Sequence, residues 1–180
     1  MSSEPLRSAP ILETSRLTLR PHTRDDLPAL AAMWADPAVV RYIGGKPSTS
    51  EESWSRLVRY AGHWPLMGFG YWAIEEKATG RFMGDAGFAD FKRELTPPLD
   101  GTPEIGWALA AWAHGKGFAT ELLPAVLAWG DEHLEARRTV CLIAPEHAVS
   151  IHLAEKFGYR RVSEVVYRGH TSLLFERGEK

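Results

Sequence analysis

The feature that most constrains this chain is a glycine turn, Gly115-Lys-Gly117, between an apolar segment and a helical one. Residues 104–109 read as a short apolar strand, and the sequence from Phe118 onward has a helical pattern. A glycine-rich turn that leads into a helix leaves backbone N–H groups unpaired, and the helix dipole adds positive potential there. The segment therefore predicts an anion site suited to phosphate, although two glycines before a helix also make an ordinary tight turn.

Length and composition indicate one soluble globular domain. A chain of 180 residues is long enough to bury roughly 70% of its unfolded surface. Hydrophobic residues make up 44% and charged residues 24%, values that are ordinary for a globular protein. We expect a disordered lead over residues 1–10, a single domain over residues 11–176 and a tail over residues 177–180.

Charge and hydropathy exclude several classes of partner. The net charge is −2 and basic residues form no cluster, so no nucleic-acid partner is expected. No segment approaches the roughly 20 apolar residues of a membrane span, and residues 1–10 lack the apolar centre of a secretory signal. We therefore expect a cytoplasmic protein without membrane association. The single cysteine, Cys141, lies in an apolar strand pattern, which favours a buried inert thiol over a nucleophile.

Hydrophobic periodicity and turn signals predict the order β-α-α-β-β-β-α-β-α-β-β. This order is typical of an α/β fold in which about seven strands form a mixed sheet with four helices on both faces. Residues 65–70 are predicted as a loop, and the long loop over residues 92–103 is of a kind that is often functional. The predicted strands cover residues 16–20, 71–74, 82–91, 104–109, 139–144, 162–167 and 172–175. The predicted helices run from 27 to about 36, from about 49 to about 60, from 118 to 134 and from 148 to 157.

Four segments carry a resemblance to a known family: residues 14–21, 104–109, 114–121 and 144–159. The third fits the pattern Gln/Arg-x-x-Gly-x-Gly/Ala, and the fourth fits Pro-x-Asn-x-x-Ser followed by Glu-Lys-x-Gly-Phe/Tyr. Together they resemble the GNAT superfamily of acetyl-CoA-dependent N-acetyltransferases. The likeness is closest to the RimJ/RimL-like branch, which contains ribosomal-protein N-terminal acetyltransferases, and it covers residues 11–176.

The resemblance implies a GNAT-like acyl-CoA N-acyltransferase fold with acetyl-CoA as co-substrate. In that fold the strands over residues 104–109 and 139–144 splay apart, and the pantetheine arm pairs with the first of them near Trp107, Leu109 and Ala111. A backbone N–H at Leu109 or a neighbour would polarise the thioester carbonyl. The pyrophosphate would lie against His114, Gly115, Lys116, Gly117, Phe118, Ala119 and Thr120.

Two positions depart from the family pattern. His114 stands where Gln or Arg is usual, which backbone binding of phosphate should tolerate. His147 stands where Asn is usual, and this puts cofactor affinity in doubt because imidazole has a different reach. Two lysines have an open role: Lys116 could add charge beside the turn and Lys156 could reach the 3′-phosphate, or both could simply be solvated.

Acetyl transfer to an amine needs a base, because an amine like that of lysine has a pKa near 10 and is mostly protonated at neutral pH. Glu104 is our first candidate, with a surface glutamate at a strand end as the alternative; Asp85 and Glu75 are weaker candidates. Ser150 matches a serine near the CoA sulfur in the RimJ/RimL-like branch and could donate to the departing thiolate. It could equally satisfy a backbone N–H at a helix start.

We therefore expect an N-acetyltransferase that transfers acetyl directly to an amine in a ternary complex. The acceptor would be a protein N-terminus or a small-molecule amine, with Trp54, Trp64, Trp72 and the loop over residues 92–103 as acceptor walls. The alternative is a non-catalytic acyl-CoA-binding or sensing module. Its support is His147 together with Ala154, which replaces a tyrosine acid of many relatives outside this branch.

Other readings are disfavoured or stay open. A nucleotide-binding loop is disfavoured because no Gly-Lys-Ser/Thr follows the turn. A metal site is not expected, since His147 and His152 are five residues apart and do not share a helix face. Monomer and homodimer both remain possible from the sequence.

Overall fold

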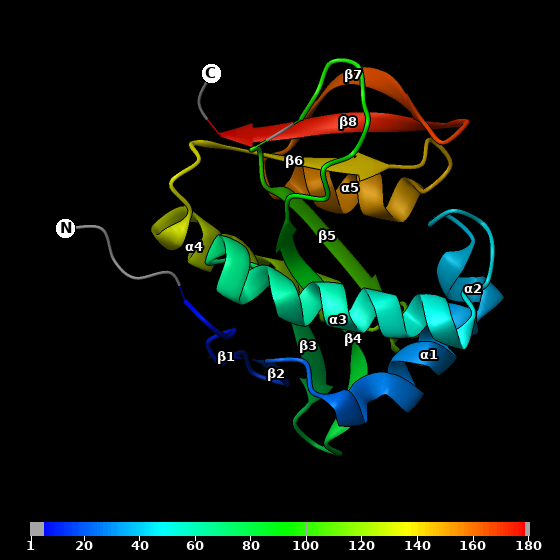
Figure 1. The fold of residues 1–180 in the computed structure, drawn as a ribbon, viewed down its shortest axis with the longest axis vertical. Helices are drawn as coiled ribbons and strands as arrows, with labels where there is room; N and C mark the ends of the chain where they lie inside the picture. The colour runs from blue at the N-terminus through cyan, green and yellow to red at the C-terminus, as the bar shows by residue number, and fades with distance from the viewer. Residues whose placement is uncertain (1–5, 100, 179–180) are drawn as a thin grey trace.

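A mixed sheet with helices on both faces forms the protein (Figure 1). The computed structural model describes residues 6–99 and 101–178. The strand order is β1-β2-β3-β4-β5-β6-β8-β7, and neighbours are antiparallel except for the parallel pair β5 and β6. The strands are β1 Leu12–Glu13, β2 Leu17–Arg20, β3 Tyr71–Glu76, β4 Arg81–Ala89, β5 Glu104–Leu109, β6 Arg138–Ile143, β7 Arg160–Tyr167 and β8 His170–Gly178. The helices are η1 Arg24–Asp26, α1 Leu27–Ala35, α2 Pro37–Val40, α3 Ser50–Met67, η2 Ala111–Ala113, α4 Phe118–His133 and α5 Ala148–Lys156.

The two sheet faces pack mainly against different helices, as the alternation along β5 shows, although Trp64 near the end of α3 joins the α4 side. Ile105 and Leu109 pack in a core that contains buried residues of α4 and α5, such as Leu122. Ala108 points to the other face and packs with Leu30 of α1 and other residues of α1–α3. In Figure 1, α1 and α3 cross the near face of the sheet and α4 passes behind it. Within the described residues, no helix combines the length and apolar character that crossing a bilayer requires.

The predicted fold class is confirmed, with eight strands and five α-helices in the described residues against about seven and four. The added elements are short: β1 has two residues, and α2 begins where Asp36 accepts a hydrogen bond from the Ala38 N–H. The splaying of β5 and β6, which the resemblance implied, is also present, because these strands share one register pair.

One predicted loop is wrong, because α3 continues through Pro65 to Met67. The helix begins with a capping box formed by Thr49 and Glu52 and ends at Gly68, whose φ is 74°. Pro65 lacks one helical N–H donor, but it lies in the last turn of the helix. Burial of Trp64, which is 2% exposed, stabilises the helical conformation of that turn.

The ends of the predicted domain are partly described. Residues 1–5 of the predicted lead and residues 179–180 of the predicted tail lie outside the described residues. Ala9 is buried and the Trp72 indole donates to the Pro10 carbonyl at 2.7 Å, so packing begins before residue 11. At the other end, Gly178 pairs with Arg138, so β8 runs past residue 176.

The loop over residues 92–103 contains no helix or strand in its described part and is anchored on the sheet. Leu95 is 8% exposed and packs against Val140 of β6 and Val165 of β7. The Asp90 carboxylate accepts hydrogen bonds from the Lys92 side chain and the Gly101 N–H. These contacts hold the loop over the β6–β8–β7 part of the sheet.

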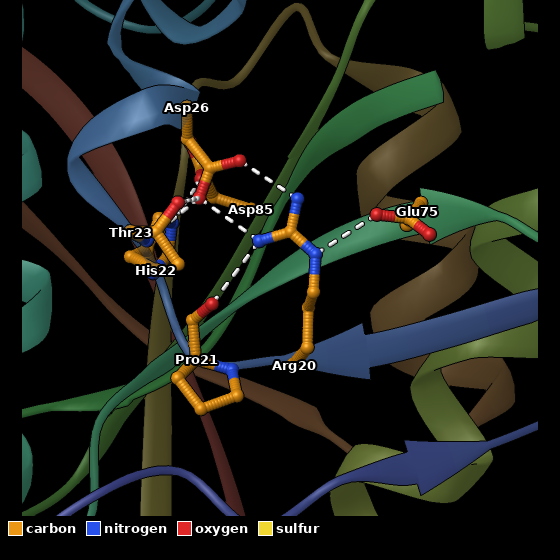
Figure 2. A network of polar contacts seen from close by, with 7 residues as sticks. All are labelled: Arg20, Pro21, His22, Thr23, Asp26, Glu75 and Asp85. Carbon is orange, nitrogen blue, oxygen red and sulfur yellow. Dashed lines mark hydrogen bonds and ion pairs between the residues drawn. The ribbon is translucent and has the colours of Figure 1, made fainter. Parts of the chain in front are cut away.

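An arginine at the end of β2 ties together the entry to α1 and the neighbouring strand. The Arg20 guanidinium donates to both oxygens of Asp26, at 2.7 and 2.9 Å, and to Glu75 of β3 at 2.9 Å (Figure 2). Burial acts to raise the pKa of Asp26, but hydrogen bonds from Arg20 and the Thr23 N–H hold that pKa below its ordinary value. The network fixes the turn that contains His22, and His22 in turn contacts the Asp85 carboxylate.

Substitution of Gly130 tests how closely α4 packs on the sheet, and Gly62 of α3 provides a comparison. A Cβ at Gly130 would lie 2.6 Å from Cζ of the buried Phe88, whereas a Cβ at Gly62 would meet nothing within 4 Å. Gly62→Ala should raise the free energy of unfolding by about 0.5–1 kcal/mol through helix propensity. Gly130→Ala should lower it by about 1–3 kcal/mol, because the packed ring cannot move freely. Urea denaturation measures both, and stabilisation by Gly130→Ala would contradict this packing.

Candidate active site

The site is a cavity that opens where the parallel strands β5 and β6 separate. The two strands pair only at Glu104 and Val140, and beyond this point they diverge. The space between them, called here the central cavity, has a volume of about 510 Å³. Its walls include Gly106 and Trp107 of β5 and Leu142 of β6. A volume of this size suits the reactive parts of two small molecules.

The edge of β5 presents unpaired backbone groups to the central cavity. The Pro103 carbonyl accepts from the Val140 N–H at 3.0 Å, so it points toward β6. Because main-chain direction alternates along a strand, Trp107 and Leu109 also turn their N–H and C=O groups to that side. His114 Nε2 donates to the Leu109 carbonyl at 2.8 Å and occupies that acceptor. The N–H groups of Trp107 and Leu109 remain to bind a ligand.

Glycines in the sheet let an aromatic hydroxyl lie against the same strand. Tyr71 of β3 is in register with Gly87 of β4 and Gly106 of β5. A Cβ at Gly106 would lie 2.1 Å from Tyr71 Oη, so only glycine leaves room for the hydroxyl there. The Tyr71 ring stacks on Tyr60 with centroids 4.4 Å apart. Burial, and then the neighbouring Tyr60, raise the pKa of Tyr71 well above its ordinary value, so the hydroxyl stays protonated.

The predicted base, Glu104, lines the central cavity but is held in an ion pair. Arg93 Nε and Nη2 donate to the two carboxylate oxygens at 2.7 and 2.8 Å, a two-point contact. Glu104 is 8% exposed, and Arg93 also lines the cavity. The carboxylate is therefore fixed in position, and both of its oxygens already accept one hydrogen bond.

The weaker base candidates do not line the central cavity. Asp85 is fully buried, where it contacts His22 Nε2 at 2.7 Å and accepts from Trp34 Nε1 at 3.1 Å. Glu75 is paired with Arg20 (Figure 2). Both carboxylates are thus engaged in contacts that stabilise the sheet and its connections.

Ser150 and His147 meet at the start of α5, on the cavity wall. Ser150 is 6% exposed and its Oγ lies 3.3 Å from His147 Nε2. The His147 ring stacks on Tyr42 with centroids 4.5 Å apart. Burial, and then the nearby His114, lower the pKa of His147, so the imidazole is neutral at pH 7. Ser150 therefore has a neutral imidazole as its partner in the first turn of α5.

The glycine loop, residues 114–120, presents donors beyond the end of β5. Gly115 and Gly117 have φ of 71° and 77°, and a Cβ at Gly115 would meet nothing within 4 Å. Among the described residues, no backbone or side-chain acceptor contacts the N–H groups of residues 115–120. The first turn of α4 adds the positive end of its dipole. This geometry is that of an anion site.

Sequence reasoning missed the residue that anchors this loop, Arg16. Arg16 Nε donates to Glu121 Oε2 at 2.6 Å, its Nη1 donates to the Lys116 carbonyl at 3.2 Å, and its guanidinium lies 4.2 Å from the Phe118 ring centroid. Burial acts to raise the pKa of Glu121, but hydrogen bonds from Thr14 and Arg16 hold it below its ordinary value. A cation therefore lies beside the glycine loop and ties it to the start of β2.

The remaining predicted cofactor residues lie outside the central cavity. Ala111 is in η2, and Ala119 and Thr120 are in the first turn of α4. Lys116 Nζ lies 5.7 Å from the Trp112 ring, next to the glycine loop. Lys156 is exposed and its Nζ lies 5.8 Å from the Phe157 ring, so no described contact links it to the loop.

The predicted acceptor walls are wrong for two tryptophans. Trp64 and Trp72 are 2% and 0% exposed and pack in the core with Trp129, so they cannot contact an acceptor. Trp54 is exposed but does not line the central cavity. Of the described residues in the loop over 92–103, Arg93 lines it. The aromatic lining instead comes from Trp34, Tyr42, Tyr60, Tyr71, Phe91, Trp107 and Tyr167.

Cys141 lines the central cavity as a buried thiol, 1% exposed. Burial, and then the charge of Glu104, raise the pKa of its thiol, which disfavours the reactive thiolate. Among the described residues, no three His, Cys, Asp or Glu side chains come together as a metal site would require.

The glycine loop, the splayed strands and the order of elements can now be compared with known proteins. A family model described as "Acetyltransferase (GNAT) domain" matches residues 16–160. The chain belongs to the GNAT family of acetyltransferases. The predicted superfamily and the predicted enzyme class are thus confirmed.

Individual relatives of this GNAT acetyltransferase agree with that assignment. It is 29% identical over 151 residues to the uncharacterized N-acetyltransferase p20 of Bacillus licheniformis. The matched segment covers 83% of this chain and 82% of p20. A Bordetella pertussis structure described as a GnaT-family acetyltransferase is 32% identical, with a TM-score of 0.83, and covers 94% of this chain and all of its own. A structure of RimL, a ribosomal L7/L12 α-N-protein acetyltransferase in complex with coenzyme A, has a TM-score of 0.75. RimL is 16% identical over 94% of this chain and 98% of its own, so this likeness shows the fold alone.

The lowered pKa of His147 makes a prediction about stability. At a pH below 6.5, the ordinary pKa of histidine, His147 of the unfolded chain binds a proton that the folded chain still excludes. The free energy of unfolding therefore falls as pH decreases from 6.5 through the folded pKa. His147→Asn should remove this contribution, so the variant loses less stability than the wild type between pH 7 and pH 5.

Urea denaturation at several pH values measures the effect. His152→Asn, which changes an exposed histidine on the same helix, is the matched control. A His147→Asn variant with the same pH dependence as the wild type would contradict the assigned shift.

Proposed function

We propose that this protein transfers the acetyl group of acetyl-CoA directly to a primary amine within a ternary complex. The observation that carries the proposal is one strand, β5, with unpaired N–H groups at Trp107 and Leu109 and the donor-rich glycine loop just beyond it. Acetyl-CoA, when bound, supplies an acetyl thioester on a long arm that ends in phosphates. The distribution of donors along β5 and the loop fits such a molecule.

The residues present fit each end of the cofactor. The N–H groups of residues 115–120 and the guanidinium of Arg16 would hold the pyrophosphate, with Lys116 adding charge from the side. His114 would act by shaping the loop, because its ring is bonded to the Leu109 carbonyl and its backbone N–H to the Ala111 carbonyl. The pantetheine arm would pair along β5 near Trp107 and Ala111, while His147 and Lys156 would contact the cofactor from α5.

The free backbone groups on β5 would assist the reaction at the carbonyl. Negative charge develops on the carbonyl oxygen as the amine attacks, and fixed N–H donors stabilise that charge. Trp107 lines the central cavity and the Leu109 N–H points to the same side of β5, so neither group needs rearrangement to serve as such a donor. Leu109 N–H is the first candidate, because its neighbouring carbonyl is already held by His114.

Glu104 and Ser150 would act on the attacking amine and on the departing thiolate, respectively. Each carboxylate oxygen of Glu104 has a second lone pair, so it can accept from a water or amine while Arg93 stays bound. Glu104 would thus take the proton of the amine through a water molecule. Ser150 would donate a hydrogen bond from its hydroxyl to the departing thiolate and keep its proton, with the neutral His147 ring orienting the hydroxyl.

A peptide N-terminus and a small-molecule amine both remain acceptor classes within this proposal. The RimJ/RimL-like segments over residues 14–21 and 144–159 support the first. The modest volume of the central cavity supports the second. A cytoplasmic location accords with either class.

The contribution of Arg16 to cofactor binding can be measured directly. Arg16→Ala removes a cation beside the glycine loop and the bonds that hold the loop to β2. Because the side chain is 45% exposed, we expect a loss of about 1 kcal/mol, or roughly fivefold in the Kd of CoA. Isothermal titration of CoA measures it. Arg24→Ala, on the exposed η1 turn, is the control, and equal CoA affinity in both variants would contradict this role for Arg16.

The acid and base roles are tested by thiol release from acetyl-CoA with a broad amine panel. Glu104→Gln should lower kcat roughly 10²-fold or more, because the amide cannot accept the proton. Ser150→Ala should lower it roughly tenfold through the loss of a hydrogen bond to a charged group. Both variants should bind CoA as the wild type does.

Two surface changes, Glu94→Gln and Ser55→Ala, serve as controls. A wild-type rate in Glu104→Gln would contradict the base role of Glu104, and a wild-type rate in Ser150→Ala would contradict the donor role of Ser150. CoA binding without thiol release from any amine would instead favour the non-catalytic acyl-CoA-binding module.

A further inference from the structure

One wall of the central cavity is a stack in which guanidinium groups alternate with aromatic rings. Arg59 lies 5.1 Å from the Phe91 ring centroid and Arg93 lies 4.7 Å from the same ring. Arg93 also lies 4.8 Å from the Tyr167 centroid, and Arg168 lies 5.3 Å from it. All five residues line the cavity, and they are called here the arginine ladder. They come from α3, the segment after β4, the last residue of β7 and the β7–β8 turn.

The charge of the cavity wall is opposite in sign to that of the whole chain. Four arginines line it, Arg56 being the fourth, against the single carboxylate of Glu104, which leaves three positive charges in excess. The complete chain has a net charge of −2. Positive charge is thus concentrated where an amine must enter, and an ordinary ammonium group would be repelled there.

Two of the ladder arginines have no anionic partner in the described residues. Arg93 is neutralised by Glu104, but no carboxylate of the described chain lies within the 4.0 Å ion-pair distance of Arg59 or Arg168. Stacking on Phe91 and Tyr167 holds the faces of these guanidinium groups and leaves their N–H edges free to donate. A guanidinium held in this way is well suited to bind a carboxylate.

The phosphates of the cofactor do not account for this charge. Arg93 binds Glu104, the first residue of β5, whereas the glycine loop follows Leu109, the last residue. The two ends of a six-residue strand are separated by about 17 Å. The glycine loop also has its own cation, Arg16. The arginine ladder therefore belongs to the acceptor end of the cavity.

We propose that the acceptor is an amine that carries a carboxylate, and that Arg59 and Arg168 bind this carboxylate. This inference rests on the proposed function, because it names the substrate class of the same site. The carboxylate offsets the repulsion between the cavity wall and the amine. The positive wall then favours the neutral form of the amine, which is the form that attacks the acetyl group. Polyamines and other polycations are excluded as good acceptors.

The first arm of the test measures binding without turnover. N-acetyl-L-glutamate and its uncharged diamide, N-acetyl-L-glutaminamide, are titrated calorimetrically into the protein with and without CoA. The wild type should bind the carboxylate probe at least tenfold more tightly than the diamide. Arg59→Gln and Arg168→Gln should each weaken the carboxylate probe roughly fivefold and leave the diamide unchanged. Their CoA affinity should stay within about twofold of the wild type, as should every affinity of the control Arg160→Gln, an exposed arginine of β7 outside the cavity.

The second arm measures thiol release with matched acceptors and distinguishes two sources of the carboxylate. L-glutamate against L-glutaminamide tests a free amino acid, and Glu-Gly-Gly-amide against Gln-Gly-Gly-amide tests a peptide N-terminus. The acidic member of at least one pair should have the higher kcat/KM, and the arginine variants should raise its KM with little change in kcat.

Three results would overturn the proposal. The first is equal affinity of the wild type for both probes, and the second is an equal loss of affinity for both probes in the arginine variants. The third is a loss of CoA affinity in those variants, which would assign the ladder to the cofactor. Failure of the proposed function looks different, since then no amine releases thiol from acetyl-CoA, whether or not CoA binds. The probe titrations on the free protein still decide the carboxylate site in that case.

Discussion

The structure depends on one interruption of backbone pairing, between β5 and β6. A single register pair, Glu104 with Val140, joins the two strands, and their remaining residues diverge. In an uninterrupted sheet the N–H groups of Trp107 and Leu109 would bond to the next strand. Here they point to the open side of β5, where Trp107 lines the central cavity, and the divergence makes room for the start of α5. A GNAT acetyltransferase thus gains both its cavity and its donors from the same missing hydrogen bonds.

Contacts distant in sequence hold the two sides of this opening. On one side, Arg16 and Thr14 bind Glu121 and fix the glycine loop to β2. On the other, the loop over residues 92–103 is anchored by Leu95 and brings Arg93 to Glu104. Because each wall is tied to a different part of the sheet, both can keep their positions without pairing to each other.

The local parts of this account could be predicted from the sequence, and the non-local parts could not. The glycine turn and the strand over residues 104–109 are local signals, and the family resemblance added the splayed strands. The Arg16–Glu121 contact joins residues 105 positions apart, and nothing in either segment indicates the other. Periodicity could not tell which aromatic residues are buried, so Trp64 and Trp72 were wrongly predicted as acceptor walls. Pro65 misled for a similar reason, since packing of Trp64 outweighed a local helix-breaking signal.

The most direct test of the central claim is an amide chemical-shift titration of the ¹⁵N-labelled protein with CoA. We predict that the largest shifts, and new protection from solvent exchange, occur at residues 115–120 and at Trp107 and Leu109, the groups without protein acceptors. Val140, whose N–H is already bonded to Pro103, should shift little. Shifts confined to other parts of the chain, with these amides unchanged at saturation, would contradict the claim that the opened strand binds the cofactor.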